Sequence, residues 1–86
     1  MTEAFERAVK EVDTLNIPPD SPDDFMIYGL FKQATVGDIN QEHPGLLDIS
    51  AKMKWEAWNR NKGLSKDDAK AAFVEVVDML KKKCKP

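Results

Sequence analysis

Tyr28, Lys32 and Lys54 carry the side chains with which this sequence could bind a phosphate group. Tyr28 and Lys32 are four residues apart, so in a helix they lie on one face. Lys54 belongs to a later segment. If the two segments pack side by side, two ammonium groups and a phenol could converge on one anion. Spacing alone fits solvent-exposed lysines better and leaves a phosphate site as the alternative.

Residues that could act as nucleophiles or metal ligands do not form a catalytic set. His43 is the only histidine and precedes Pro44, where a solvated loop side chain is the simpler interpretation. Ser21, Ser50 and Ser65 stand where helices are predicted to begin, so capping explains them. No Cys/His cluster has the spacing of a metal site, and no glycine-rich phosphate loop occurs. We therefore expect no catalytic residue, no metal and no cofactor.

Composition narrows the class of protein and its partners. The 86 residues suffice for a single domain, 1–86, with ordinary hydrophobic (42%) and charged (33%) fractions. One cysteine, Cys84, allows no internal disulfide, and no signal peptide or bilayer-spanning segment is recognisable, so we expect a cytoplasmic protein. The net charge is −2, yet segment 32–66 carries six basic and four acidic residues. A local anionic ligand suits this pattern better than a nucleic acid.

Apolar periodicity and capping residues predict four helices and an all-α fold. The first covers about residues 3–15, with an apolar stripe along one face. The second opens at Ser21, followed by a proline and two acids, and stops before Gly37. The third covers about 50–61, and the fourth begins at Ser65. Without alternating strand patterns, we expect a helical monomer.

The connections restrict how these helices are arranged. The short turn at Gly63 and Leu64 predicts that the third and fourth helices are antiparallel neighbours. The thirteen residues 37–49 can extend over roughly 40 Å, whereas the second helix is roughly 24 Å long. That connection can therefore return along the bundle and set the second and third helices parallel. The lengths permit this topology without requiring it.

Several runs of sequence resemble the acyl-CoA-binding protein family. The main ones are 28–38 (YGLFKQATVGD), 44–48 (PGLLD) and 52–59 (KMKWEAWN). Phe5, the 64–68 turn (LSKDD) and the lysine-rich end also fall where the family has similar residues. The resemblance implies a four-helix up-down-down-up bundle of that family's type, which binds acyl-CoA esters.

The resemblance also implies roles for particular residues. In the family, residues matching Tyr28, Lys32 and Lys54 contact the nucleotide part of the ligand, chiefly its 3′-phosphate. Trp55 matches a tryptophan near the ligand groove, whereas Trp58 is more simply interpreted as core. Val9, Phe25 and Met53 are candidates for an apolar trough that holds the acyl chain, and each could equally be plain core. Phe31 and Phe73 offer aromatic surface to the nucleotide, and Phe73 could also belong to the core stripe of the fourth helix.

This chain departs from the family pattern at several positions. Phe31 and Phe73 stand where the family commonly has tyrosine, and Asp13, Pro18 and Ser50 where it often has lysine. The stacking surfaces are kept but polar donors are lost. We therefore expect altered affinity or chain-length preference, and a gain in binding when one hydroxyl is restored.

The expected function is reversible binding, intracellular transport and buffering of medium- to long-chain acyl-CoA esters, with delivery to enzymes that use acyl-CoA. Two alternatives remain at this point. A thioester hydrolase would need a nucleophile with a base in reach, and His43 is the only histidine available. A helical module that binds protein or membrane surfaces would ignore both CoA and acyl-CoA.

Overall fold

The computed structural model describes residues 2–83, which form four helices: α1 (Thr2–Val12), α2 (Pro22–Thr35), α3 (Ile49–Asn59) and α4 (Lys66–Lys83). Within these residues no strand occurs, and the predicted all-α class is confirmed. Cys84 lies outside the described residues. Across the described part, no helix combines the length and apolar character needed to cross a membrane.

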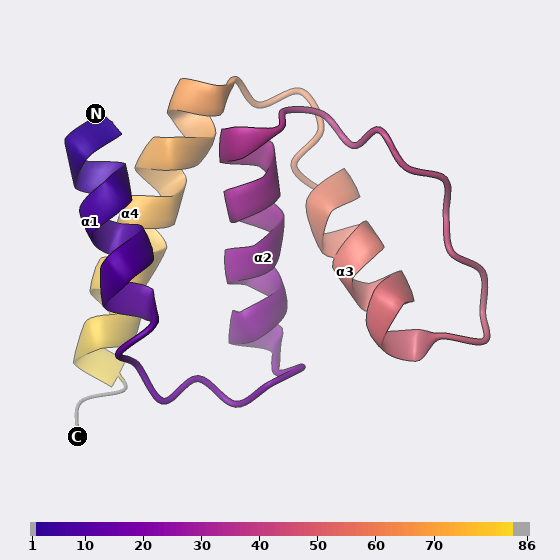
Figure 1. Ribbon diagram of the computed structural model, residues 1–86, viewed down its shortest axis with the longest axis horizontal. Helices are drawn as coiled ribbons and strands as arrows, with labels where there is room; N and C mark the ends of the chain where they lie inside the picture. The colour runs from indigo at the N-terminus through magenta and orange to yellow at the C-terminus, as the bar shows by residue number, and fades with distance from the viewer. Residues whose placement is uncertain (1, 84–86) are drawn as a thin grey trace.

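The helices form a flat layer that measures 36 × 28 × 15 Å between Cα extremes, in the order α1, α4, α2, α3 (Figure 1). α2 and α3 run parallel to each other, and α1 and α4 run in the opposite direction (Figure 1). The up-down-down-up topology is therefore confirmed. The long connection between α2 and α3 does return along the bundle.

The prediction that the third and fourth helices are neighbours is wrong. α3 packs only on α2 among the helices, whereas α4 packs on α1 and α2. The connection 60–65 is long enough to cross the end of α2, and it is held there. Gln33 of α2 donates to the carbonyl of Leu64 at 2.8 Å, and the Gly63 N–H donates to Asp38 at 2.9 Å. These bonds place α3 and α4 on opposite sides of α2.

Local hydrogen bonds fix the helix ends. The Ser21 and Ser65 hydroxyls accept the N–H groups of Asp24 and Asp68 at 3.2 and 3.0 Å, as predicted for helix caps. α1 ends three residues earlier than predicted. The Thr14 hydroxyl donates to the Glu11 carbonyl at 2.7 Å. The N–H groups of Thr14 and Leu15 each donate to the carbonyl three residues earlier, so the chain turns here.

The cap of α3 differs from the prediction. Asp48, not Ser50, caps this helix, because its carboxylate accepts the Ala51 N–H at 3.0 Å. The Ser50 hydroxyl instead donates to Asp20 at 3.1 Å, which links the start of α3 to the loop before α2. Ser50 is therefore a tertiary contact between two segments.

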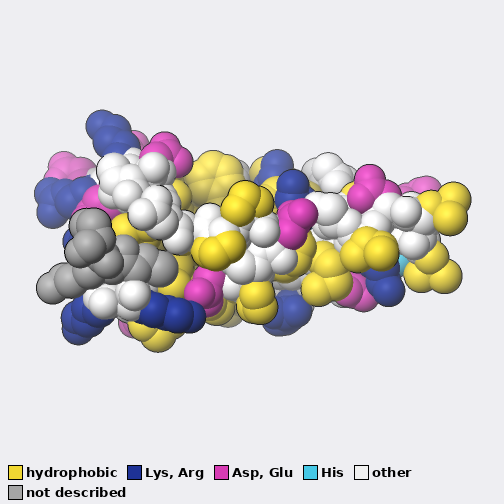
Figure 2. Space-filling model, turned by 90° about the horizontal axis from the view of Figure 1, so that it is seen from below, with side chains coloured by type: hydrophobic (Ala, Val, Ile, Leu, Met, Phe, Trp, Pro, Cys, Tyr) yellow, Lys and Arg dark blue, Asp and Glu magenta, His cyan; other side chains and the backbone are white. Residues whose placement is uncertain are grey.

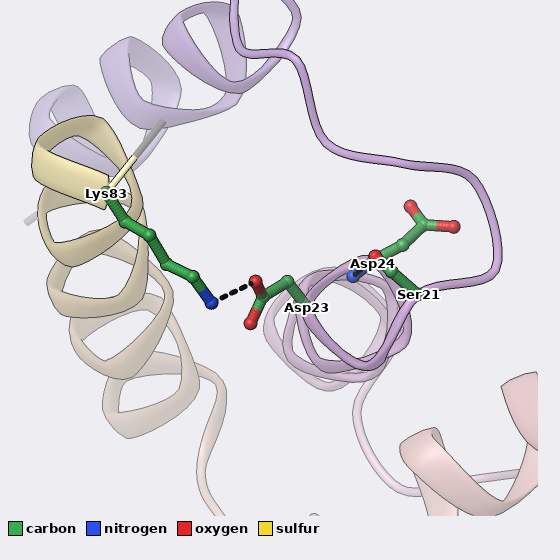
Figure 3. Close-up of polar contacts among 4 residues, drawn as sticks. All are labelled: Ser21, Asp23, Asp24 and Lys83. Carbon is green, nitrogen blue, oxygen red and sulfur yellow. Dashed lines mark hydrogen bonds and ion pairs between the residues drawn. The ribbon is translucent and has the colours of Figure 1, made fainter. Parts of the chain in front are cut away.

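The end of α4 is tied to its neighbours by ion pairs. Lys83 lies 2.9 Å from Asp23 in the first turn of α2 (Figure 3), and Lys81 pairs with Glu11 of α1. Figure 3 also shows that Asp23 points toward α4 while Ser21 and Asp24 lie on the other side of the same turn. Exposed pairs of this kind contribute little stability, about 0–1 kcal/mol each.

Two kinds of packing hold the layer together. Apolar residues of α1, α2 and α4 form one buried cluster: Phe5, Ala8, Leu30, Ala34, Ala69, Phe73 and Val77. α3 instead approaches α2 closely where Gly29 faces Ala57, and it buries Trp58 almost completely. The interpretation of Trp58 as a core residue agrees with its burial. The close approach brings side chains of α2 and α3 within reach of one another.

Candidate functional site

Tyr28 lies close to two lysines that come from different helices. The ammonium nitrogen of Lys32, one turn later on α2, is 5.8 Å from the centre of the Tyr28 ring, and that of Lys54 on α3 is 5.6 Å from it. Lys32 is also 5.6 Å from the ring centre of Trp58. Aromatic faces attract cations at these distances, so Tyr28 attracts both ammonium groups. The structure thus brings together the three side chains that the sequence grouped.

A cavity of about 150 Å³ opens beside this cluster, between α2, α3 and the loop that precedes α3. Its lining combines polar and apolar side chains: Tyr28, Gln41, Glu42, Pro44, Ala51, Lys54 and Trp55. The Trp55 indole N–H donates to the Gln41 carbonyl at 2.7 Å, and His43 packs edge-on against Trp55 at 4.9 Å. Trp55 therefore serves both as a wall of the cavity and as the anchor of the loop.

His43 takes part in a local turn rather than in a catalytic pair. Its Nδ1 accepts the N–H of Gly45 at 3.1 Å, and its ring rests on Trp55. Within residues 2–83, no group of three or more metal-ligating side chains is placed to hold a metal ion.

A second cavity, of about 290 Å³, lies on the other side of Tyr28. It is largely apolar and aromatic, with two acidic residues at its edge: Val9, Val12, Asp13, Asp24, Ile27, Tyr28, Phe31 and Phe73. Phe31 is 36% exposed, whereas Phe73 is 1% exposed and packs against Phe5 with ring centres 5.1 Å apart. Tyr28 forms a wall of both cavities, so it joins a polar cleft to an aromatic one.

Phe25 and Met53 meet in a third cavity. This space, of about 210 Å³, also includes Asp20, Pro22 and Arg60. Phe25 is buried and Met53 is 37% exposed. Val9 was grouped with these two residues as a candidate trough, but it lines the aromatic cavity instead. The reason is topological, because α1 packs on α4 and α2 lies between α4 and α3.

Sequence reasoning missed the group that holds the loop after α2. Gln33 is fully buried, and its amide donates to Asp38 at 2.9 Å and to Leu64 at 2.8 Å. The Trp58 indole N–H donates to the Gly37 carbonyl at 2.8 Å. A glutamine within an otherwise apolar helix face was the signal that could have revealed this group, since buried amides need partners.

The Asp38 carboxylate has a lowered pKa. The main cause is the hydrogen bond from the Gly63 N–H, followed by the bond from the Gln33 amide, and nearby Lys62 adds to both. Each of these favours the charged form. Asp38 therefore remains an acceptor over the whole physiological pH range and keeps the two connections at this end of α2 together.

Comparisons with known proteins agree with this geometry. Residues 2–77 match the family model described as "Acyl CoA binding protein". The acyl-CoA-binding protein homolog 1 of Caenorhabditis elegans is 45% identical over 80 residues, 93% of each chain. The crystal structure of Oryza sativa acyl-CoA-binding protein 2 superposes with a TM-score of 0.88 at 34% identity, covering 95% of this chain and 91% of that one.

A further structure supports the same assignment. The crystal structure of the acyl-CoA-binding protein from Moniliophthora perniciosa has a TM-score of 0.84 at 37% identity, covering 100% of this chain and 85% of that one. The match of family model, relative and solved structures spans nearly the whole chain. This chain belongs to the acyl-CoA-binding protein family.

Proposed function

We propose that this protein binds acyl-CoA esters reversibly and without chemical change. The observation that carries the proposal is the convergence of Lys32 and Lys54 on Tyr28. Family membership supports it, because the matched family and the curated relative are named for acyl-CoA binding. As a member of that family the chain is a binding protein rather than an enzyme.

The two lysines are proposed to hold the 3′-phosphate of the ligand. Two ammonium groups and the Tyr28 hydroxyl can each donate to phosphate oxygens, and charged hydrogen bonds of this kind are about twice as strong as neutral ones. The lysines come from α2 and α3, which the Gly29–Ala57 contact holds together. Helices that are already held together lose less freedom when both lysines bind one anion.

The adenine ring is proposed to lie in the aromatic cavity. Tyr28 and Phe31 supply faces for a flat ring, and the space has about 290 Å³. Phe73 and Val9 line the same cavity. Asp13 stands at its edge, where the family often has lysine, so this chain offers the head group less positive charge on that side.

The acyl chain is proposed to follow the α2–α3 contact toward Phe25 and Met53. Phe25 lies one helical turn before Tyr28, and Met53 directly precedes Lys54. A ligand whose head group rests on Tyr28 and Lys54 is therefore a short distance from this cavity. Removal of the chain from water there supplies the apolar part of the binding energy, about 0.8 kcal/mol per buried CH₂ group.

In the cell, we propose transport and buffering of medium- to long-chain acyl-CoA esters by a cytoplasmic monomer. Delivery to enzymes that use acyl-CoA belongs to the same proposal. Reversible binding is required for it, since a carrier must release its ligand to an enzyme. The alternative of a surface-binding module without a ligand is not favoured, because the family to which the chain belongs is defined by acyl-CoA binding.

Calorimetric titration with a long-chain acyl-CoA, with CoA and with the free fatty acid tests the proposal. We expect the ester to bind most tightly, because it engages both the lysines and the apolar cavity. Release of free thiol, followed in the same mixtures, separates carrier from hydrolase. Ligand binding without thiol release is the expected result. Equal and weak heats with all three ligands, or steady thiol release, would contradict the proposal.

A further inference from the structure

Among the described residues, the three large apolar side chains with the highest exposure lie within four positions of the sequence. Leu46, Leu47 and Ile49, here called the apolar tip, are 75%, 102% and 72% exposed. Figure 2 shows hydrophobic side chains gathered at the end of the molecule that α3 and its preceding loop build. An exposed apolar patch of this kind marks a surface for a partner.

The form of the apolar tip restricts what that partner can be. Leu47 is as exposed as in an extended peptide, so the tip projects and offers no groove into which a helix or a peptide could fit. Three aliphatic side chains supply on the order of 300 Å² on one chain, whereas a stable protein interface buries about 600 Å² or more on each partner. A second copy of the chain is therefore a poor fit. The fluid apolar interior of a lipid bilayer, into which single side chains can insert, fits the tip better.

Charged side chains of both signs surround the apolar tip, and the lysine among them can face anionic lipid head groups. Lys52 lies one helical turn after Ile49 on α3 and is half-buried. The nearest acid, Asp48, is engaged as the cap of α3 through the Ala51 N–H, and Asp20 accepts the Ser50 hydroxyl. Apolar side chains flanked by lysine bind membranes through insertion and attraction to anionic lipids.

The tip is also close in sequence to the cavity of Phe25 and Met53. Met53 lies one turn after Ile49, is itself 37% exposed, and lines that cavity. Met53 therefore lies between the tip and that cavity along α3. Long-chain acyl-CoA esters are amphiphiles that partition into bilayers, so docking of the tip would bring this cavity toward the place where the ligand resides. This last step rests on the proposed function, whereas the docking itself does not.

We propose that Leu46, Leu47 and Ile49 dock the protein weakly and reversibly on a lipid bilayer, with Lys52 facing anionic head groups. Full insertion of a single long acyl chain gives only marginal membrane binding, and three short side chains bury less apolar surface than such a chain. The docking is therefore transient. It places the Met53 end of the protein against the surface.

Vesicle flotation without any acyl-CoA tests the docking. The probes are vesicles of phosphatidylcholine and vesicles of phosphatidylcholine with phosphatidylserine. We expect the Leu46→Ser/Leu47→Ser variant to bind both kinds roughly thirtyfold more weakly than the wild type, since two side chains lose their insertion. The matched control is Val36→Ser/Met79→Ser, which removes two exposed apolar side chains elsewhere (43% and 54% exposed) and should bind as the wild type does.

A Lys52→Gln variant tests the part played by charge. It should lose affinity for the vesicles with phosphatidylserine and keep its affinity for phosphatidylcholine alone. Equal vesicle binding by the wild type and the Leu46→Ser/Leu47→Ser variant would overturn the proposal, as would no vesicle binding by the wild type. A concentration-dependent wild-type dimer in sedimentation velocity, lost in that variant, would overturn it in favour of self-association.

The proposed function and the docking fail in different experiments. Both leucines lie outside the cavities described for the ligand, so Leu46→Ser/Leu47→Ser should bind acyl-CoA in solution as tightly as the wild type. Absence of acyl-CoA binding by the wild type in a titration without vesicles would refute the proposed function and leave the docking result intact. Loss of vesicle binding alone, with solution binding unchanged, is the result expected for a docking surface.

Discussion

Gly29 on α2 lies directly against the backbone of Ala57 on α3: a Cβ atom built on Gly29 would stand 2.6 Å from the Ala57 carbonyl carbon and collide with its oxygen. A substitution of Gly29 must therefore push the helices apart. Because Tyr28 and Lys54 are close neighbours of this contact in the sequence, the separation of the helices also sets the distance between the groups proposed to bind the ligand head.

The contact can be tested with Gly29→Ala, because the sign of the change in stability depends on whether the helices touch here. Helix propensity alone predicts a gain of about 0.5–1 kcal/mol in the free energy of unfolding, because alanine replaces glycine in a helix interior. The collision predicts a loss of about 1–3 kcal/mol, as for other overpacked cores. We expect a lower melting temperature together with weaker acyl-CoA binding. A more stable variant would show that the helices are not in contact at this point.

Lys54→Ala should weaken acyl-CoA binding more than Lys52→Ala. Lys54 lies 5.6 Å from the Tyr28 ring centre and lines the polar cavity, whereas Lys52 is not among the residues that line it. Loss of a charged hydrogen bond costs about 1.5–3 kcal/mol, which weakens binding roughly tenfold to 150-fold. Calorimetric titration of both variants with acyl-CoA in solution measures the two losses in affinity. Equal losses at the two positions would indicate a diffuse basic surface instead of a defined site.

Phe31 and Phe73, the two positions at which the family commonly has tyrosine, differ in burial. Phe31 is 36% exposed and can present a hydroxyl to the ligand, so Phe31→Tyr should gain about 0.5–1.5 kcal/mol in binding with little change in stability. Phe73 is 1% exposed and lies in the core cluster, although it also lines the aromatic cavity. We therefore expect Phe73→Tyr to lower the melting temperature, because its hydroxyl must be buried.

Measurement of affinity and melting temperature for both tyrosine variants checks this division. A Phe73→Tyr variant with tighter CoA binding and an unchanged melting temperature would show that its hydroxyl reaches the ligand through the cavity. That result would restore the expectation drawn from the sequence. A Phe31→Tyr variant with unchanged affinity would remove Phe31 from the head-group site.

Stability should fall in acid partly through Asp38. Its pKa is lowered in the folded protein by the Gly63 N–H and the Gln33 amide. The unfolded chain binds the proton more readily, so the stabilisation is present above the ordinary carboxyl pKa of about 4 and is lost as the pH falls through the lower folded value. Asp38→Asn should be less stable at neutral pH and lose less stability on acidification than the wild type.

Chemical denaturation at a series of pH values measures the Asp38 effect, with Glu75→Gln on the exposed side of α4 as a control. The control should follow the wild-type curve. An Asp38→Asn curve parallel to that of the wild type down to the lowest pH would mean that the carboxylate contributes nothing through its charge.

Local chemistry made part of the fold predictable. Ser21, Ser65 and Gly37 were recognised because a cap or a left-handed turn depends on the residues next to it. The same reasoning failed at the start of α3, where Asp48 and Ser50 are both good caps and stand two residues apart. Only the position of Asp20, thirty residues earlier, gives Ser50 its actual partner.

Long-range contacts made the rest unpredictable. Tyr28 and Lys32 could be grouped because they are one helical turn apart, and Lys54 joined them once the second and third helices were taken as parallel neighbours. The placement of α3 against α2 alone depends on Gly29 and on the hydrogen bonds of Gln33, which no periodicity reveals. Val9 lines a different cavity from Phe25 and Met53 for the same reason, since the partners of α1 follow from the topology.

Lys32 and Lys54 are proposed to hold the 3′-phosphate, and a comparison of two proteins with two ligands tests this role most directly. Wild-type protein and the Lys32→Ala/Lys54→Ala variant are titrated with one acyl-CoA and with its 3′-dephosphorylated form. We predict that the wild type prefers the phosphorylated ligand by about 100-fold or more, as expected for two charged hydrogen bonds, and that the variant shows almost no preference. A variant that keeps the full preference would contradict the account, because the phosphate would then be bound elsewhere.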